Sequence, residues 1–243
     1  MNDTQRGALQ TLGILGGMGP EATALLFQLI IRQTPVSSDA DHIPICIYNY
    51  PQIPDRTRAI FADGPSPAPH VIEGLQVLER TPAVCVLIPC NTVFHFYPEF
   101  KDRTRLPIVH LIHATATTLR QRPDAPRRIG ILATNGTRKT GLYERFLQEQ
   151  GLQPVYPDEA LQEALMQEIY GIKAGRIQST ATRNAARALL DSGADVVLLA
   201  CTELSIIHDD VARDMPVADA LRILAEIGVR IGLGKRSPQE YSI

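Results

Sequence analysis

The chain has 243 residues, of which 44% are hydrophobic, and a formal net charge of −2 at pH 7. This length can bury a substantial core. The near-neutral charge, without basic runs interleaved with aromatics, argues against a nucleic-acid partner. No apolar run approaches the roughly 18 residues that a membrane span needs. Residues 1–10 are polar and lack the apolar core of a signal peptide. We therefore expect a frayed tail on a cytoplasmic protein whose thiols stay reduced.

The first half of the chain predicts strands alternating with helices. A glycine-rich turn at 16–19 precedes Pro20 and Glu21, which suit the first turn of a helix. A polar, proline-containing stretch at 120–128 is the expected domain joint. The predicted strands are 11–15, 43–48, 83–89 and 108–112; the predicted helices are 20–33 and 71–80, with a short helix from residue 92 and a flexible loop at 64–69.

The order of elements repeats in the second half. Its predicted strands are 129–133, 154–156 and 196–200, and its predicted helices are 137–150, 158–170, 176–191 and 219–231. Alternating strands and helices indicate parallel sheets covered on both faces. We expect the last helix to pack back onto the first half. The predicted domains are therefore residues 1–118 with 218–243, and residues 119–217.

Two cysteines end matching strands, one in each half. Cys90 follows an apolar run that ends Leu-Ile-Pro, and Cys201 follows one that ends Leu-Leu-Ala. The segment at 13–23, which contains the glycine turn, is similar in sequence to the segment at 130–140. Ligands of such sheets bind at the carboxyl ends of strands. If the halves pack face to face, the two thiols address one site from opposite sides.

This geometry suits the transfer of a proton from one face of a carbon to the other. A thiol has a reference pKa of about 8.5, so a modest shift yields thiolate at neutral pH. Repulsion between two thiolates favours a pair with one proton, and a free helix N-terminus favours the anion. The alternative for each cysteine alone is a buried core thiol, which we expect for Cys46 and Cys85.

Five segments carry a family resemblance: residues 16–23 (GGMGPEAT), 51–57 (PQIPDRT), 89–92 (PCNT), 169–173 (IYGIK) and 201–204 (CTEL). Over residues 13–219 the sequence resembles the aspartate/glutamate racemase superfamily of cofactor-independent amino-acid racemases, and most closely its aspartate racemase branch. The resemblance implies two pseudo-symmetric parallel-sheet α/β domains with the site in the cleft between them. It also implies a small-molecule amino-acid substrate, no cofactor or metal, and a homodimer.

The resemblance further assigns roles to single residues. Cys90 and Cys201 become the two acid/base groups, and Arg56 and Lys173 hold the side-chain carboxylate of the substrate. Taken alone, Arg56 reads as a solvated loop charge and Lys173 as an exposed helix-end cation. The other assigned residues are Asn91, Thr92, Thr134 and Thr202 on the α-carboxylate, Met18 at the floor, and Glu203 near the ammonium or simply at its helix start.

One motif departs from the family pattern. Family members often read Pro-Cys-Asn-Thr-Ala-His, whereas Val93 and Phe94 follow here and His95 comes one place later. The displaced histidine affects substrate choice and cysteine tuning, but it removes neither thiol.

The sequence gives little support for a dinucleotide site, a metal site or pyridoxal phosphate. Residues 17–22 fit a degenerate dinucleotide fingerprint, but the next strand ends without the acid that binds a ribose. His110 and His113 would face opposite ways in a strand, which disfavours a metal site. No lysine ends an apolar strand, which argues against pyridoxal phosphate.

We therefore predict cofactor-independent racemisation of an acidic amino acid, aspartate and possibly glutamate, by two cysteines. Another reaction of the superfamily stays open: racemisation of a different amino acid, a maleate-type isomerisation or a decarboxylation. A non-catalytic α/β ligand-binding protein is a third possibility.

Overall fold

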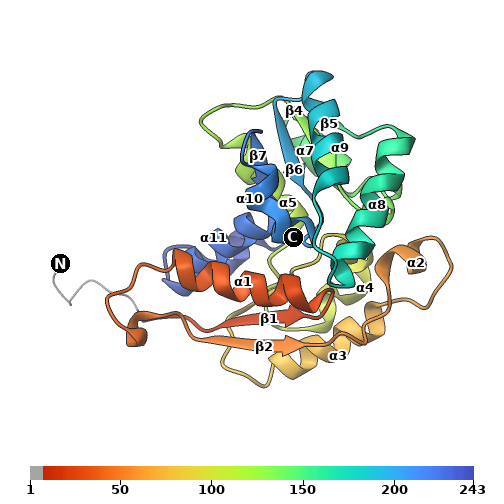
Figure 1. Cartoon of the computed structure of the whole chain (residues 1–243). Helices are drawn as coiled ribbons and strands as arrows, with labels where there is room; N and C mark the ends of the chain where they lie inside the picture. Colours follow the sequence, from red (N-terminus) through yellow and green to blue (C-terminus); the bar gives the residue numbers. More distant parts are fainter. Residues whose placement is uncertain (1–7) are drawn as a thin grey trace.

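The computed structural model describes residues 8–243, so most of the predicted frayed tail lies outside the described residues. The chain forms two parallel sheets, one in each lobe of the molecule (Figure 1). The first lobe is built from β1 (Leu12–Gly16), α1 (Pro20–Gln33), β2 (Ile45–Asn49), α2 (Arg56–Ile60), α3 (Ala68–Leu78), β3 (Cys85–Leu87), α4 (Tyr97–Phe100) and α5 (Leu111–Arg120).

The second lobe repeats the arrangement of the first. Its elements are β4 (Arg128–Leu132), α6 (Asn135–Lys139), α7 (Leu142–Glu149), β5 (Gln153–Val155), α8 (Glu159–Lys173), α9 (Thr180–Asp191), β6 (Val196–Leu199), α10 (His208–Val211) and β7 (Val217–Asp219). The last helix of the chain is α11 (Ala220–Gly232). The strand orders are β2-β1-β3 and β5-β4-β6-β7. In each sheet the first strand lies between the second and the third. The predicted pair of pseudo-symmetric parallel-sheet α/β domains is confirmed.

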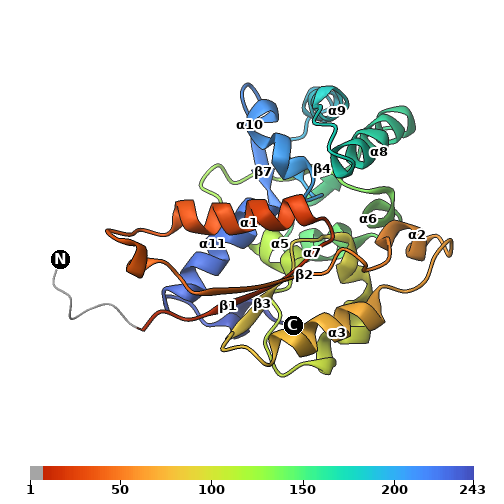
Figure 2. The ribbon, with the colours of Figure 1, turned by 60° about the horizontal axis from the view of Figure 1, so that its bottom comes forward.

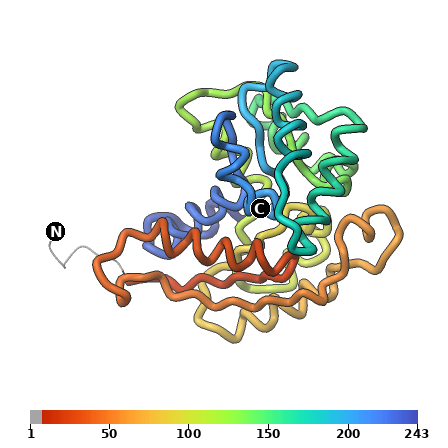
Figure 3. The backbone as a smooth tube through the Cα atoms, viewed as in Figure 1, coloured from red at the N-terminus to blue at the C-terminus, as the bar shows by residue number. Residues whose placement is uncertain are grey.

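The last helix returns to the first lobe. α11 packs against α1 and α5, and the backbone trace shows it crossing back behind α1 (Figure 3). A Cβ at Gly228 would lie 2.9 Å from Leu87 Cδ1 and 3.5 Å from Leu12 Cδ1, so a larger residue there would require the Leu87 side chain to move. This contact was predicted; the exact domain limits stay a prediction.

The glycine turn after β1 brings the next loop to the sheet. Gly17 has φ +98°, and a Cβ there would lie 2.3–2.6 Å from the backbone of Tyr50. The amide of Tyr50 donates to the carbonyl of Gly16 at 3.1 Å, and the Gly17 amide donates to Thr23 Oγ1 at 3.0 Å. A side chain at Gly17 is therefore excluded by sterics and by backbone conformation. The turn places Met18 and the loop after β2 side by side.

Several predicted elements were wrong in their limits, and the helix predicted at 137–150 is two helices, α6 and α7. The strand at 108–112 is a single bridge between Val86 and Ile108, and α5 begins at Leu111 because His110 Nδ1 accepts the His113 amide at 3.2 Å as an N-cap. The helix predicted to end before Gly171 continues to Lys173. A Cβ at Gly171 would meet nothing within 3.8 Å, so this glycine does not mark a helix end. The Pro/Ser/Gly loop ends earlier than predicted, because α3 begins at Ala68.

Helices cover the sheets, and α2 of the first lobe packs against α6 of the second (Figure 2). Among residues 8–243 no helix combines the length and the apolar character needed to cross a bilayer.

Burial of His110 makes the stability of the fold depend on pH. Its ring packs against Phe94, Tyr97 and Phe146, and burial lowers its pKa to about 3. Between pH 6.5 and that value the unfolded chain binds the extra proton. Stability should therefore fall as the pH drops below 6.5, by up to about 1.4 kcal/mol per pH unit. Urea unfolding at pH 7 and pH 5 measures this loss.

The matched variants are His110→Asn, which keeps an N-cap acceptor, and His95→Asn at an exposed position. The first should be less sensitive to pH than the native protein, and the second equally sensitive. Equal pH dependence of all three proteins would contradict the assignment to His110.

Candidate active site

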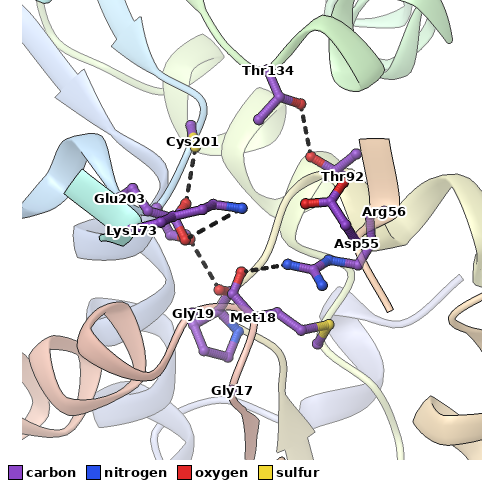
Figure 4. Close-up of polar contacts among 12 residues, drawn as sticks. Gly17, Met18, Gly19, Asp55, Arg56, Thr92, Thr134, Lys173, Cys201 and Glu203 are labelled. Atoms are coloured by element: carbon purple, nitrogen blue, oxygen red, sulfur yellow. Dashed lines mark hydrogen bonds and ion pairs between the residues drawn. The ribbon is translucent and has the colours of Figure 1, made fainter. Parts of the chain in front are cut away.

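A small pocket lies between the two lobes, at the carboxyl ends of both sheets (Figure 4). The room inside it is only about 10 Å³, close to the least space that holds one water molecule. The structure brings together all ten side chains predicted for the site: Met18, Arg56, Cys90, Asn91, Thr92, Thr134, Lys173, Cys201, Thr202 and Glu203. The predicted site residues therefore line one narrow space between the lobes.

The two cysteines occupy equivalent places in the two lobes. Cys90 lies three residues beyond β3, and Cys201 lies two residues beyond β6. Both are buried, with exposed fractions of 5% and 4%. The helices that follow are short 3₁₀ segments, Thr92–Phe96 and Leu204–Ile207, so any helix-dipole contribution at either thiol is small.

The remaining cysteines lie outside the pocket. Cys85 is fully buried within β3, where burial raises the pKa of its thiol to about 12, and Cys46 is half-buried in β2. Because Cys85 is fully buried in the core and does not line the pocket, it is a packing residue.

Hydrogen bonds between threonines and the opposite lobe tie the two cysteine loops together. Thr202 Oγ1 donates to the carbonyl of Pro89 at 3.0 Å. Thr92 Oγ1 lies 3.0 Å from Thr134 Oγ1 and 3.0 Å from Thr137 Oγ1. Pro89 directly precedes Cys90, and Thr202 directly follows Cys201. These bonds therefore fix one thiol relative to the other.

Arg56 is a buried cation held by main-chain carbonyls. Its Nη1 donates to the carbonyls of Ile53 and Pro54 at 3.1 and 2.8 Å, and its Nη2 donates to that of Met18 at 3.0 Å. Its Nε is buried without a hydrogen-bond partner, and no described residue forms an ion pair with it. The alternative of a solvated loop charge was wrong. A buried guanidinium without a carboxylate favours binding of an anion.

The short helix that carries Arg56 is fixed at both ends. The Asp55 carboxylate caps it by accepting the Arg58 amide at 2.9 Å. The helix packs on α6, where a Cβ at Gly136 would lie 3.0–3.1 Å from Thr57 and Ile60. Position 136 therefore allows the two lobes to touch beside the pocket.

Lys173, Glu203 and Cys201 form a chain of polar contacts (Figure 4). The Cys201 thiol donates to Glu203 Oε2 at 3.0 Å, and Glu203 Oε1 lies 3.9 Å from Lys173 Nζ. Burial and then Glu203 raise the pKa of Cys201 well above its usual value, although Lys173 opposes this. Burial disfavours the charged form of Lys173, but Glu203 and other anions outweigh it and raise its pKa.

Asn91 presents a free amide group. Its Oδ1 accepts a hydrogen bond of 2.6 Å from the fully buried Tyr143 hydroxyl on α7, while its Nδ2 is buried without a partner. Because the oxygen is committed, the NH₂ group is the part left to bind a ligand oxygen.

Sequence reasoning missed four residues of this site. Asp55 and Thr57 line the pocket and lie in the 51–57 motif beside Arg56, so the motif itself was a signal for them. Thr137 and Tyr143 support Thr92 and Asn91 from elements distant in sequence, and nothing local marks them. The displaced His95 is exposed and does not line the pocket. Phe94 instead packs on His110, with ring centroids 4.7 Å apart.

Among residues 8–243 no group of three or more His, Cys, Asp or Glu side chains could hold a metal ion.

Comparison with known proteins places this pocket in a family. Residues 15–228 match the Asp/Glu/hydantoin racemase family model. The chain belongs to this family. It is therefore an enzyme of the isomerase class, an amino-acid racemase, and the resemblance seen in the sequence is confirmed.

Three relatives show how far the similarity extends. The broad-specificity amino-acid racemase RacX of Bacillus subtilis is 28% identical over 93% of this chain and 100% of its own length. The structure of the Picrophilus torridus aspartate racemase is 29% identical, covers 96% of this chain and 97% of its own, and superposes with a TM-score of 0.80. An aspartate racemase homologue from Pyrococcus horikoshii, 22% identical over 92% and 99%, shares the fold with a TM-score of 0.73.

The racemase pocket predicts an energetic coupling between Tyr143 and Asn91. Tyr143→Phe leaves a buried acceptor unsatisfied, so it should lower the free energy of unfolding by about 1–3 kcal/mol. The double variant Tyr143→Phe with Asn91→Ala should lose less than the sum of the two single losses, because both partners are then absent. Urea unfolding of the four proteins gives the coupling. Strictly additive losses would show that the bond contributes nothing.

Proposed function

We propose that this racemase interconverts the enantiomers of an acidic amino acid, aspartate and possibly glutamate, without a cofactor. The observation that carries the proposal is that Cys90 and Cys201 line one small pocket on loops hydrogen-bonded to each other. The 29% identity to an aspartate racemase over nearly the whole chain supports the choice of substrate.

In the proposed reaction one thiolate removes the proton from Cα while the other thiol adds a proton to the opposite face. The first cysteine ends as a thiol and the second as a thiolate, so charge and protons balance. The same groups with exchanged roles run the reverse reaction. Positioned acid/base groups of this kind typically contribute 10²–10⁴-fold to a rate.

The pocket residues divide by the part of the substrate that they hold. Arg56 and Lys173 bind the side-chain carboxylate, and Met18 forms the floor. Asn91, Thr92, Thr134 and Thr202 bind the α-carboxylate through the free amide and the hydroxyl and backbone donors, and Glu203 lies near the ammonium. The predicted domain limits, the homodimer and the cytoplasmic location belong to the same proposal.

Racemisation of other amino acids is a second candidate, favoured by one feature of the charges. Lys173 is already paired with Glu203 at 3.9 Å, and the pocket lining holds two cations and two carboxylates. A zwitterion without a side-chain charge leaves this balance unchanged. The relative RacX is named for broad specificity. A panel of L- and D-amino acids assayed for exchange of the α-hydrogen with D₂O separates the two candidates.

Single cysteine variants test the proposed mechanism. Cys90→Ala and Cys201→Ala should each abolish racemisation of aspartate, measured by chiral chromatography. Each should still exchange the α-hydrogen of one enantiomer in D₂O, and the two variants should act on opposite enantiomers. Cys46→Ala, outside the pocket, is the control and should racemise normally. If the native enzyme left both aspartate and glutamate optically unchanged, the acidic-substrate proposal would fail.

A further inference from the structure

The two cysteines of this pocket have unequal neighbours. Cys201 lies 3.0 Å from the carboxylate of Glu203, and this contact is a hydrogen bond in which the thiol donates. Within residues 8–243, Cys90 has neither an ion-pair partner nor a hydrogen bond to its sulfur. At the position that corresponds to Glu203 it is followed by Thr92, a neutral side chain. Nearly equal burial, 5% and 4%, means that access does not distinguish the thiols.

Resting on the two-thiol function proposed above, we propose that Glu203 holds the proton of the cysteine pair on Cys201, so that Cys90 is the thiolate of the resting enzyme. Glu203 then acts through Cys201 as a positioning residue and does not touch the reacting carbon. Ionisation of Cys201 would place a thiolate 3.0 Å from a buried carboxylate, and two like charges at that distance repel strongly.

The position of Glu203 suits this role better than a capping role. It precedes the 3₁₀ helix Leu204–Ile207, but its side chain makes no capping hydrogen bond. Its Oε1 makes no hydrogen bond and lies 3.9 Å from Lys173. Gly19 at the start of α1 leaves it room, because a Cβ there would lie 3.2 Å from Oε1. The carboxylate is therefore committed to the thiol on one oxygen and to a cation on the other.

The other charged groups around Cys201 do not reverse the assignment. Lys173 favours the Cys201 thiolate, but its effect on the thiol is smaller than that of Glu203. Glu203 lies 3.0 Å from the thiol, whereas Lys173 lies 3.9 Å from Glu203 and also interacts with Asp55. The titratable groups that face Cys201 or its ion pair are Glu203 on its own loop, Lys173 on α8, Arg56 with its neighbour Asp55 at α2, Tyr143 on α7 and Cys90 across the pocket. Tyr143 stays a neutral phenol because burial raises its pKa.

The inequality has a kinetic consequence. The resting form is ready for the enantiomer whose α-hydrogen faces Cys90. The other enantiomer needs the rarer form of the enzyme, in which the thiolate is on Cys201. Its apparent KM is therefore raised by the reciprocal of the fraction of enzyme in that rarer form. Because racemisation has an equilibrium constant of one, kcat/KM is the same for both enantiomers, and kcat and KM must rise together for the disfavoured one.

The decisive experiment measures the ionisation of each thiol directly and needs no turnover. The protein is treated with iodoacetamide between pH 6 and pH 10, and alkylation of each cysteine is followed by mass spectrometry. We expect Cys90 to react at lower pH than Cys201. In Glu203→Gln, which removes the charge but keeps the size, alkylation of Cys201 should move to lower pH and become at least tenfold faster at pH 7. Glu203→Asp, which keeps the charge, should resemble the native protein.

The fully buried Cys85 reports on the fold in the same experiment. It should stay unmodified in all three proteins, so faster alkylation of Cys201 in Glu203→Gln is not caused by unfolding. Ultraviolet absorbance of the thiolate supplies a second measurement without a reagent. The Cys201→Ala variant should keep its thiolate to lower pH than the Cys90→Ala variant.

Three results would overturn the assignment: Cys201 reacting at lower pH than Cys90, no shift in Glu203→Gln, or thiolate absorbance in the reverse order. These outcomes are separate from the fate of the racemase mechanism. An enzyme that racemises while its thiols ionise together refutes the role of Glu203 alone. A protein with the predicted order of ionisation but no turnover supports that role and refutes the proposed reaction.

Discussion

A hydrogen bond between the two cysteine loops is the constraint on which the pocket depends. Thr202 Oγ1 donates to the carbonyl of Pro89 at 3.0 Å, and it joins the residue after Cys201 to the residue before Cys90. Each loop extends a buried parallel strand, and one hydrophobic cluster contains residues of both strands, such as Leu87 and Leu198. The bond adds a polar link between the two loops, and a shift of either sheet would break it inside a buried environment.

Charge balance is the second constraint on this site. Arg56 is buried in the pocket, where an isolated charge is costly, whereas Lys173 at the end of α8 reaches the pocket from a partly exposed position. The two cations are stabilised in different ways. Main-chain carbonyls surround Arg56, whereas the carboxylate of Glu203 neutralises Lys173. Arg56 therefore keeps its full charge for a ligand. Lys173 can bind one only by sharing or leaving Glu203, so the two cations do not contribute equally to substrate choice.

Local sequence patterns were sufficient to predict the strand ends, the glycine turn and the two thiols. Each of these depends on residues close together in the chain, as the run before Cys201 shows. The burial of Arg56 and the contact of Tyr143 with Asn91 depend on the packing of distant elements, and local pattern carries no information about them. Arg56 entered the predicted site through its family motif, and Tyr143 did not enter it at all.

The errors have the same origin. The run at 108–112 is apolar enough for a strand, but the ring nitrogen of His110 caps a helix that begins one residue later. The glycine at 171 resembles a helix stop, yet α8 continues because the left-handed turn comes only at Gly175, with φ +80°. In both cases a single tertiary or backbone detail decided between two conformations that the sequence allows.

The duplicated fold and the unequal thiols together explain how a near-symmetric scaffold serves this chemistry. The proposed racemisation uses two acid/base groups on opposite faces of a carbon, and the loops that follow β3 and β6 each bring one cysteine to the same pocket. It also needs the groups to differ in protonation at any instant. The second residue after each cysteine breaks the symmetry: Thr92 is neutral and bonds to Thr134 across the cleft, whereas Glu203 is charged and bonds to its own thiol. The fold thus provides the pair of cysteines, and in our proposal the carboxylate of Glu203 distinguishes them.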